Sequence, residues 1–105
     1  MIKEEFEKIV AVLEETDMNN YAVIEPLWEK EIELFTRDIH DTINFLQNDC
    51  TANQFSWMSE VWDEIAEKTK SSEFVECLKE VAKKFPKECA KFNIAGSIES
   101  AEGYL

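Results

Sequence analysis

The scarcity of chain-breaking residues constrains this chain more than any other feature. Its 105 residues include only two glycines and two prolines. Because tight turns between strands depend on such residues, a fold made of many short strands is disfavoured, and long helices are favoured. The hydrophobic share of 45%, with seven Phe and three Trp, gives the chain enough apolar surface to fold around a core despite its high charge.

Apolar residues recur at steps of three and four, which is the spacing of an amphipathic helix. The pattern predicts four main helices, covering Ile2–Thr16, Pro26–Asp49, Thr51–Lys68 and Ser72–Phe85. The second would be the longest, with about 22 residues over roughly 33 Å, and would be the central element of the fold. Residues 21–24 are predicted to form a loop that covers the core.

Several helix ends are marked by specific residues. Thr51 and Gln54 have the spacing of a capping box, in which each side chain satisfies a backbone N–H at a helix start. Ser72 is expected to be the N-cap of the fourth helix. Pro86 is expected to end that helix and to begin a short turn that runs to Phe92.

The C-terminal segment is predicted to be short and only partly helical. Asn93 and Gly96 would close the turn that starts at Pro86, and residues 97–105 would add a last turn that docks Ile98 and Tyr104. The sequence therefore predicts a single all-α domain over residues 1–105, a four-helix bundle-like domain with a short C-terminal helical extension.

Negative charge is concentrated in the N-terminal part of the chain. The formal net charge is −12. Residues 1–67 hold 17 acidic and 4 basic side chains, whereas residues 68–91 hold seven lysines and four glutamates. Such a field attracts basic partners and repels nucleic acids and anionic membranes. The alternative is a solvated surface that has no partner.

Residues typical of catalytic and metal sites are sparse. His40 is the only histidine, and the positions three and four residues away from it hold no metal-ligating side chain. No phosphate-binding loop is possible with two glycines, and no nucleophile signature occurs. We therefore expect no metal, no cofactor and no enzymatic activity.

The cysteines and the N-terminal residues indicate the cellular compartment in which the protein is expected. Cys50, Cys77 and Cys89 are odd in number and form no CxxC pair, which disfavours a disulfide framework and indicates a reducing environment. The first residues lack the pattern of a secretory leader, and no run is long enough for a membrane span. We expect a cytoplasmic protein.

The segment from Thr51 to Ile65 places an indole among carboxylates. On a helical wheel Trp57 lies close to Glu64, outside the apolar stripe. Like charges at helical spacing destabilise a helix, and an apolar anchor ringed by charge is typical of an interaction hot spot. The predicted partner-binding residues are Asp38, Asp41, Asp49, Trp57, Glu60, Asp63, Glu64 and Glu67. The alternative is a Trp57 packed against the neighbouring helix beside a solvated acidic face.

The stretch from Thr51 to Thr69, together with the following Ser72-Glu73-Phe74, resembles small acidic helical immunity proteins of bacterial toxin–immunity systems, including those of contact-dependent growth inhibition. The resemblance covers residues 38–105. It implies a cytoplasmic protein that binds the toxic domain of a delivered effector, often a basic nuclease. These families share no catalytic motif, so the resemblance assigns no functional residue.

The expected function is stoichiometric inhibition of a cognate toxin domain, by a monomer in a one-to-one complex. Carboxylates of the second and third helices would pair with basic toxin residues, with Trp57 at the centre and without direct contact to nucleic acid or membrane. One alternative is a small acidic secretion chaperone or adaptor that holds a helical segment of its partner. Another is a regulatory subunit of a larger complex.

Overall fold

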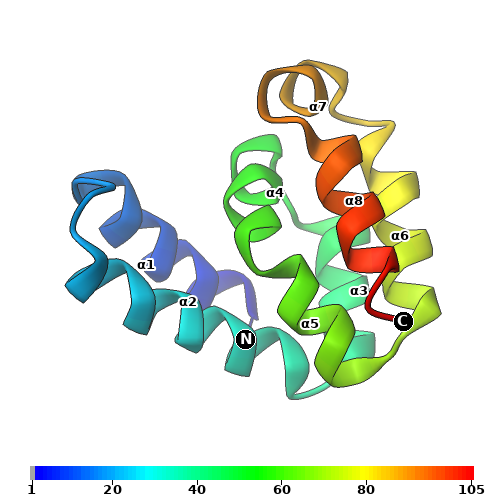
Figure 1. Cartoon of the computed structure of the whole chain (residues 1–105), viewed down its shortest axis with the longest axis horizontal. Helices are drawn as coiled ribbons and strands as arrows, with labels where there is room; N and C mark the ends of the chain where they lie inside the picture. Colours follow the sequence, from blue (N-terminus) through cyan, green and yellow to red (C-terminus); the bar gives the residue numbers. More distant parts are fainter. Residues whose placement is uncertain (1) are drawn as a thin grey trace.

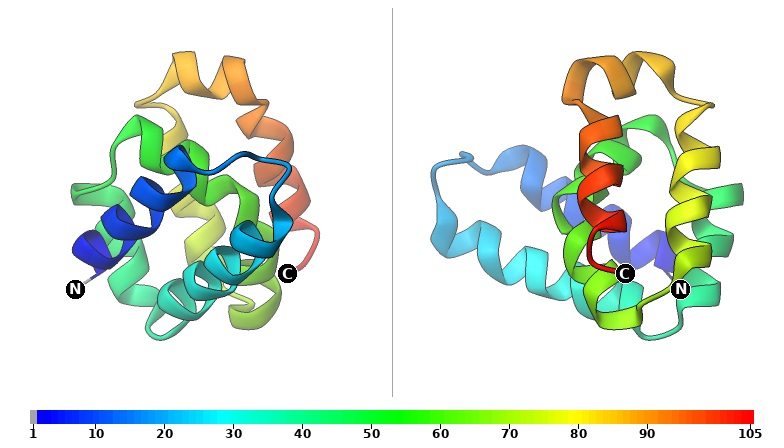
Figure 2. Two further views of the ribbon diagram at one scale, coloured as in Figure 1. Left: turned by 90° about the vertical axis from the view of Figure 1, so that its left-hand side faces the viewer. Right: turned by 45° about the vertical axis from the view of Figure 1, so that its right-hand side comes forward.

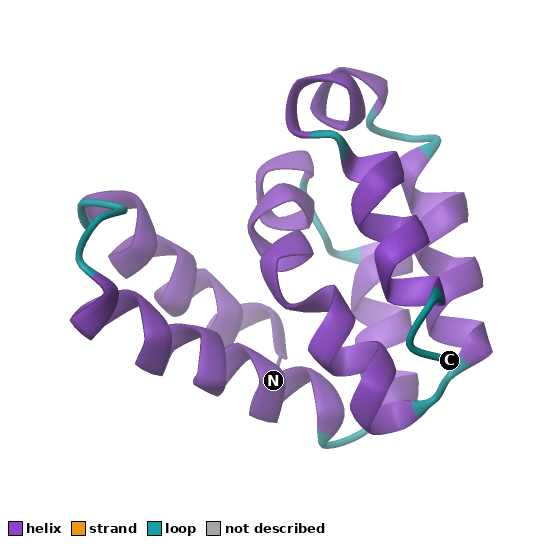
Figure 3. Ribbon diagram, viewed as in Figure 1, coloured by secondary structure: helices purple, strands orange, loops and turns teal. Residues whose placement is uncertain are grey.

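The computed structural model describes residues 2–105 and contains no strand in that range (Figure 3). The prediction of an all-α fold is confirmed. In chain order the elements are α1 (Ile2–Glu15), α2 (Tyr21–Thr36), α3 (Ile39–Asn48), α4 (Ala52–Met58), the 3₁₀ turn η1 (Ser59–Val61), α5 (Trp62–Thr69), α6 (Ser72–Ala82), α7 (Pro86–Phe92) and α8 (Ile94–Glu102).

The helices form two groups that meet at α5. The antiparallel pair of α1 and α2 makes one side of the molecule, and α3, α6 and α8 make the other (Figure 1). Helix α5 packs against α2 on one side and against α8 on the other. Helix α7 lies across one end of the second group, where it contacts α4 and α8 (Figure 2). The surfaces of α4, η1 and α5 therefore lie between the two groups.

The predicted continuous helix over residues 26–49 is wrong, because the chain turns between α2 and α3. Asp38 adopts an extended backbone with φ −148° and caps α3, where its carboxylate accepts a hydrogen bond from the His40 N–H at 3.0 Å. The buried Thr42 hydroxyl donates to the Phe35 carbonyl at 2.8 Å. These side chains replace helical hydrogen bonds with local ones, and the helix ends there.

An aromatic cluster explains why the apolar spacing continues across this turn. Phe6 of α1 meets Phe35 of α2 edge-on at 5.0 Å between ring centroids, and meets Phe45 of α3 at 5.9 Å. All three rings are buried. Both α2 and α3 thus direct their apolar stripes into one core, so the periodicity alone does not reveal the break.

The start of α2 also differs from the prediction. Residues 21–24 belong to the helix, and Pro26 lies inside it rather than at its first position. The N–H groups of Val23 and Ile24 both donate to the Asn20 carbonyl at 3.1 Å. Because Ile24 is fully buried, its packing fixes this first turn to the core.

The predicted third helix starts as expected but is interrupted. Both hydrogen bonds of the Thr51–Gln54 capping box are present, at 3.0 and 3.1 Å. The 3₁₀ turn η1 then separates α4 from α5, and Val61 leaves helical geometry with ψ 7°. The predicted apolar stripe is nevertheless buried, namely Phe55, Met58, Val61, Trp62 and Ile65.

The cap of α6 is one residue earlier than predicted. The Ser71 hydroxyl, not that of Ser72, accepts a hydrogen bond from the Phe74 N–H at 3.1 Å. The helix ends at Ala82, before the predicted Phe85, which precedes α7. Pro86 begins α7, as predicted.

The C-terminal segment holds a nine-residue helix, α8, where a single turn was predicted. Gly96 lies inside α8 and does not end a segment. A Cβ at this position would lie 2.6 Å from the Asn93 Nδ2, so a larger residue would require the Asn93 side chain to move. Ile98 is buried as predicted, whereas Tyr104 is 41% exposed and its carbonyl accepts a hydrogen bond from the Lys70 ammonium.

Paired substitutions distinguish the two possible caps of α6. We expect Ser71→Ala to lower the free energy of unfolding by about 1 kcal/mol, because the Phe74 N–H loses its acceptor. Ser72→Ala, at the first helical residue, should change it by less than about 0.5 kcal/mol. Urea denaturation of both variants measures the difference, and a larger loss in Ser72→Ala would contradict the assigned cap.

Candidate functional site

The predicted acidic face is divided by the fold into separate surfaces. Asp38 and Asp41 line a small hollow between α1, α2 and α3, together with Arg37. Arg37 forms ion pairs with Glu5 at 3.4 Å and with Glu33 at 3.1 Å. The negative charge of this hollow is therefore partly compensated, and the two aspartates do not share a hollow with Trp57.

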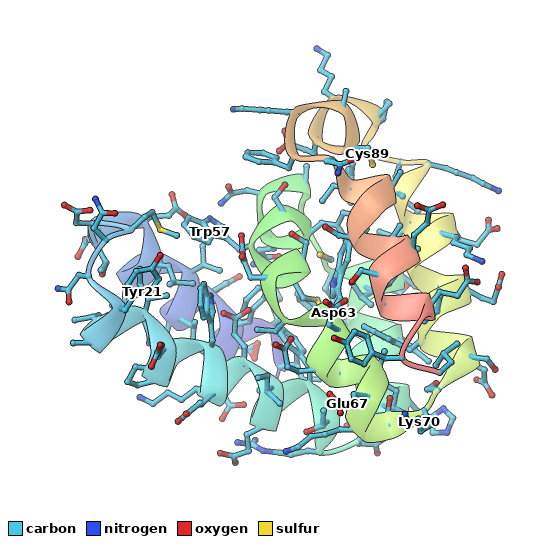
Figure 4. All side chains as sticks on the ribbon, in the orientation of Figure 1. Tyr21, Trp57, Asp63, Glu67, Lys70 and Cys89 are labelled. Atoms are coloured by element: carbon cyan, nitrogen blue, oxygen red, sulfur yellow. The ribbon has the colours of Figure 1, made fainter. Side chains whose placement is uncertain are left out.

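Asp49 and Asp63 have local roles. Asp49 is exposed and forms the C-cap of α3, where its N–H donates to the Phe45 carbonyl. Asp63 faces α8, and its carboxylate accepts a hydrogen bond from the Ser100 hydroxyl at 2.9 Å (Figure 4). This bond attaches α5 to α8, so the Asp63 carboxylate already has a partner within the fold.

Glu64 and Glu67 line a groove between α5 and α2, which we call the α2–α5 groove. Its volume is about 480 Å³, and its walls are Glu29, Ile32, Glu33, Glu64, Glu67 and Lys68. Four carboxylates thus surround a groove that has one lysine in its walls. The sequence pattern identified the α5 carboxylates of this groove and missed those contributed by α2.

Trp57 lines a second hollow, which we call the Trp57 pocket. The indole is partly buried against the core and also faces the pocket (Figure 4). The pocket has a volume of about 390 Å³, and its walls are Met18, Asn53, Ser56, Trp57, Ser59, Glu60, Phe92 and Ser97. Met18 and Phe92 are nearly half exposed, at 46% and 48%. Residues far apart in sequence therefore form one mainly apolar hollow.

Two carboxylates that lie outside the Trp57 pocket accept hydrogen bonds from polar side chains in its walls. Glu14 of α1 accepts a hydrogen bond from the Asn53 side-chain amide at 3.1 Å. Glu88 of α7 accepts one from the Ser56 hydroxyl, also at 3.1 Å. These bonds connect α4 to α1 on one side and to α7 on the other.

Glu60 connects the pocket with the α2–α5 groove. It lies on η1, it is exposed, and it precedes Glu64 by four residues. Desolvation at its position raises the pKa of the Glu60 carboxyl, and the nearby Glu64 carboxylate raises it further. Glu60, Glu64 and Glu67 thus form one continuous acidic stripe, the η1–α5 stripe, that runs from the Trp57 pocket into the groove.

Sequence reasoning missed the buried Glu31 of α2. Its side chain is fully buried, and neither carboxylate oxygen has a hydrogen-bond partner among residues 2–105. Burial, followed by the charge of Glu60, raises the pKa of the Glu31 carboxyl to about 8. The sequence did contain a signal for this burial, because Glu31 lies four residues after Leu27 and three before Leu34, on the apolar face of the helix.

The remaining residues that could carry chemistry are the metal-ligating types and the cysteines. Within residues 2–105, no three His, Cys, Asp or Glu side chains gather in a way that would hold a metal ion. The three cysteines are free. Burial, followed by the proximity of Cys77, raises the pKa of the Cys50 thiol to about 12, which makes it a poor nucleophile. No helix in this range is both long and apolar enough to cross a membrane.

Comparison with models of known protein families, with characterised proteins and with solved structures finds no match for this chain. The assignment of a site therefore depends on its geometry. That geometry brings Trp57, Glu60, Glu64 and Glu67 onto adjoining surfaces and places Asp38, Asp41, Asp49 and Asp63 elsewhere.

The buried Glu31 makes stability depend on pH. Between its ordinary value of 4.5 and its folded value of about 8, the native state keeps a proton that the unfolded chain releases. The free energy of unfolding therefore falls as the pH rises through this window. We expect Glu31→Gln to remove this contribution, so that the variant gains at least about 1 kcal/mol relative to the parent between pH 5 and pH 8.

Urea denaturation across that pH range measures the effect. Glu29→Gln is the matched control, because it makes the same change at an exposed position of the same helix. Parallel stability curves for the parent and Glu31→Gln would contradict the burial of an uncompensated carboxyl at this position.

Proposed function

We propose that this protein binds and neutralises a basic protein domain, in the manner of the immunity proteins that its sequence resembles. The observation that supports this proposal is the continuity of the η1–α5 stripe with the Trp57 pocket. An apolar pocket with an indole wall adjoins an acidic groove, and Glu60 belongs to both the pocket and the stripe. This combination fits a partner that presents apolar and cationic side chains together.

The charge distribution favours a basic partner. The α2–α5 groove has four carboxylates and one lysine in its walls, and the whole chain has a net charge of −12. Such a surface accelerates encounters with a positively charged protein in a salt-dependent manner. Because nucleases bind phosphates with a basic surface, an acidic stripe of this kind suits the substrate-binding face of a nuclease. Occupation of that face would exclude the substrate.

A secretion chaperone or adaptor is the second candidate. Exposed apolar side chains at the end of the α1–α2 pair favour it, because Met18 is 46% and Tyr21 57% exposed. Such proteins are usually dimers that hold a segment of the partner. Sedimentation or light scattering distinguishes the two candidates, since the neutralising protein is expected to be a monomer and the chaperone a dimer.

The direct test is co-expression with the product of the neighbouring reading frame, followed by co-purification at low and moderate salt. A one-to-one complex with a basic domain, whose toxicity is suppressed in the co-expressing cells, is the expected result. A complex in which the partner keeps full activity would favour the chaperone instead.

Trp57 provides the apolar contact of this complex. We expect Trp57→Ala to weaken binding of the co-purified domain by about 2 kcal/mol, or roughly 30-fold in Kd. Tyr104→Ala is the control, because it removes an exposed aromatic ring outside the pocket. Calorimetry of the two variants measures the effect. Equal affinities for the parent and Trp57→Ala would rule out this placement of the interface.

We expect Glu64 and Glu67 of α5 to affect mainly the rate at which the protein associates with the basic domain. The double substitution Glu64→Gln and Glu67→Gln should slow association and reduce its dependence on salt, because it removes charge from the η1–α5 stripe. Glu73→Gln with Glu80→Gln makes the same charge change on α6. Stopped-flow measurements at several ionic strengths compare the pairs, and an equal effect of both pairs would indicate only a general influence of net charge.

A further inference from the structure

The Trp57 pocket has the features of a receptor for one planar cation. We propose that it binds a single guanidinium group, that of an arginine side chain on the partner. The identity of the partner rests on the proposed function above, whereas the chemistry of the pocket follows from its own walls.

The pocket offers flat apolar surfaces for such a group. Trp57 and Phe92 contribute aromatic rings, and Met18 contributes a flexible thioether side chain. Aromatic faces attract cations through their negative electrostatic potential, and a guanidinium also stacks on them. The Phe92 ring already shows this behaviour within the chain, because the Lys91 Nζ lies 5.1 Å from its centroid.

The charged side chain in the walls of the pocket is a carboxylate, and the Lys91 ammonium lies over the Phe92 ring. Glu60 is the only charged residue in its walls, and none of the ion pairs within residues 2–105 includes it. Glu14 and Glu88 add two further carboxylates directly behind Asn53 and Ser56. An anionic ligand is therefore repelled, and a neutral apolar ligand would desolvate the Glu60 carboxylate without a partner.

An arginine side chain matches these walls better than a lysine does. Its apolar stem fits against Met18 and Phe92, and its planar head can stack on Trp57 while it donates a pair of hydrogen bonds to Glu60. The serine hydroxyls of Ser56 and Ser59 lie in the same walls and provide further acceptors. A lysine would provide a point charge without the stacking surface.

The electrostatic environment of Glu60 also favours a bound guanidinium group. Desolvation and the neighbouring Glu64 carboxylate both disfavour its charged form and raise its pKa. A cation bound beside Glu60 would reverse both effects, since it stabilises the carboxylate and screens it from Glu64. Binding should therefore be stronger at pH 8 than at pH 5, where more of the Glu60 carboxyl and of the neighbouring Glu31 carboxyl of α2 is protonated.

The test is an NMR titration with two blocked tripeptides, acetyl-Gly-Arg-Gly-amide and its citrulline analogue. Citrulline has the same shape and is uncharged. We expect the arginine peptide to shift the indole N–H resonance of Trp57 in a saturable manner, and the citrulline peptide to bind at least about tenfold more weakly. Equal binding of the two peptides, or no shift with either, would overturn the proposal.

Two matched variants test whether the Glu60 carboxylate is the charge that attracts the arginine peptide. Glu60→Gln should reduce arginine binding to the level of citrulline, whereas Glu73→Gln, which makes the same change at an exposed position of α6, should leave it unchanged. An equal loss in both variants would mean that net charge, not the pocket, attracts the peptide. Unchanged backbone amide spectra of Glu60→Gln and Glu73→Gln away from the substituted residues would show that both variants are folded.

The outcomes separate this proposal from the proposed function. Failure of the arginine peptide to bind, with a basic domain still recovered in a salt-dependent complex, would overturn the pocket assignment and leave the proposed function in place. Saturable arginine binding without any basic protein partner would support the pocket assignment and contradict the proposed function.

Discussion

The packing of Trp62 at the junction of η1 and α5 is the contact on which the rest of this structure depends. Its indole is fully buried and lies 4.8 Å from the Phe55 ring, so it joins the two parts of an interrupted helix. The 3₁₀ turn that precedes it places Glu60 at the surface. Glu60 lines the Trp57 pocket, and Glu64, four residues later, lines the α2–α5 groove. The same feature thus closes the core and exposes Glu60 on the surface for which we propose a partner.

Glu31 connects the stability of the fold with that surface. A buried carboxyl without hydrogen-bond partners is costly, and the charge of Glu60 adds to the cost of ionising it. The charged groups that face α2 from other elements are Glu5 and Lys8 of α1, Asp38 at the N-cap of α3, Asp41 of α3, Glu60 of η1, and Glu64, Glu67 and Lys68 of α5. None of them pairs with Glu31. A cation bound beside Glu60 would weaken the repulsion that Glu31 experiences, so binding and folding favour one another.

Local signals in the sequence were sufficient to predict much of the fold but little of the candidate site. The capping box at Thr51 and the start of α7 at Pro86 depend on neighbouring residues, and both are present. The turn at Asp38 was not predictable from periodicity, because α2 and α3 face the same aromatic core. The position of Asp63 against Ser100, and of Glu31 inside the core, depend on helix packing that no local pattern encodes.

The most direct test of this account is a map of the interface in the purified complex. Amide chemical-shift changes, or protection from hydrogen exchange, are measured for the free chain and for the chain bound to the co-purified basic domain. We expect the changes to lie on residues 53–67, on the facing part of α2 from Glu29 to Glu33, and around Phe92. Changes confined to α3, α6 and the outer face of α8 would contradict the account.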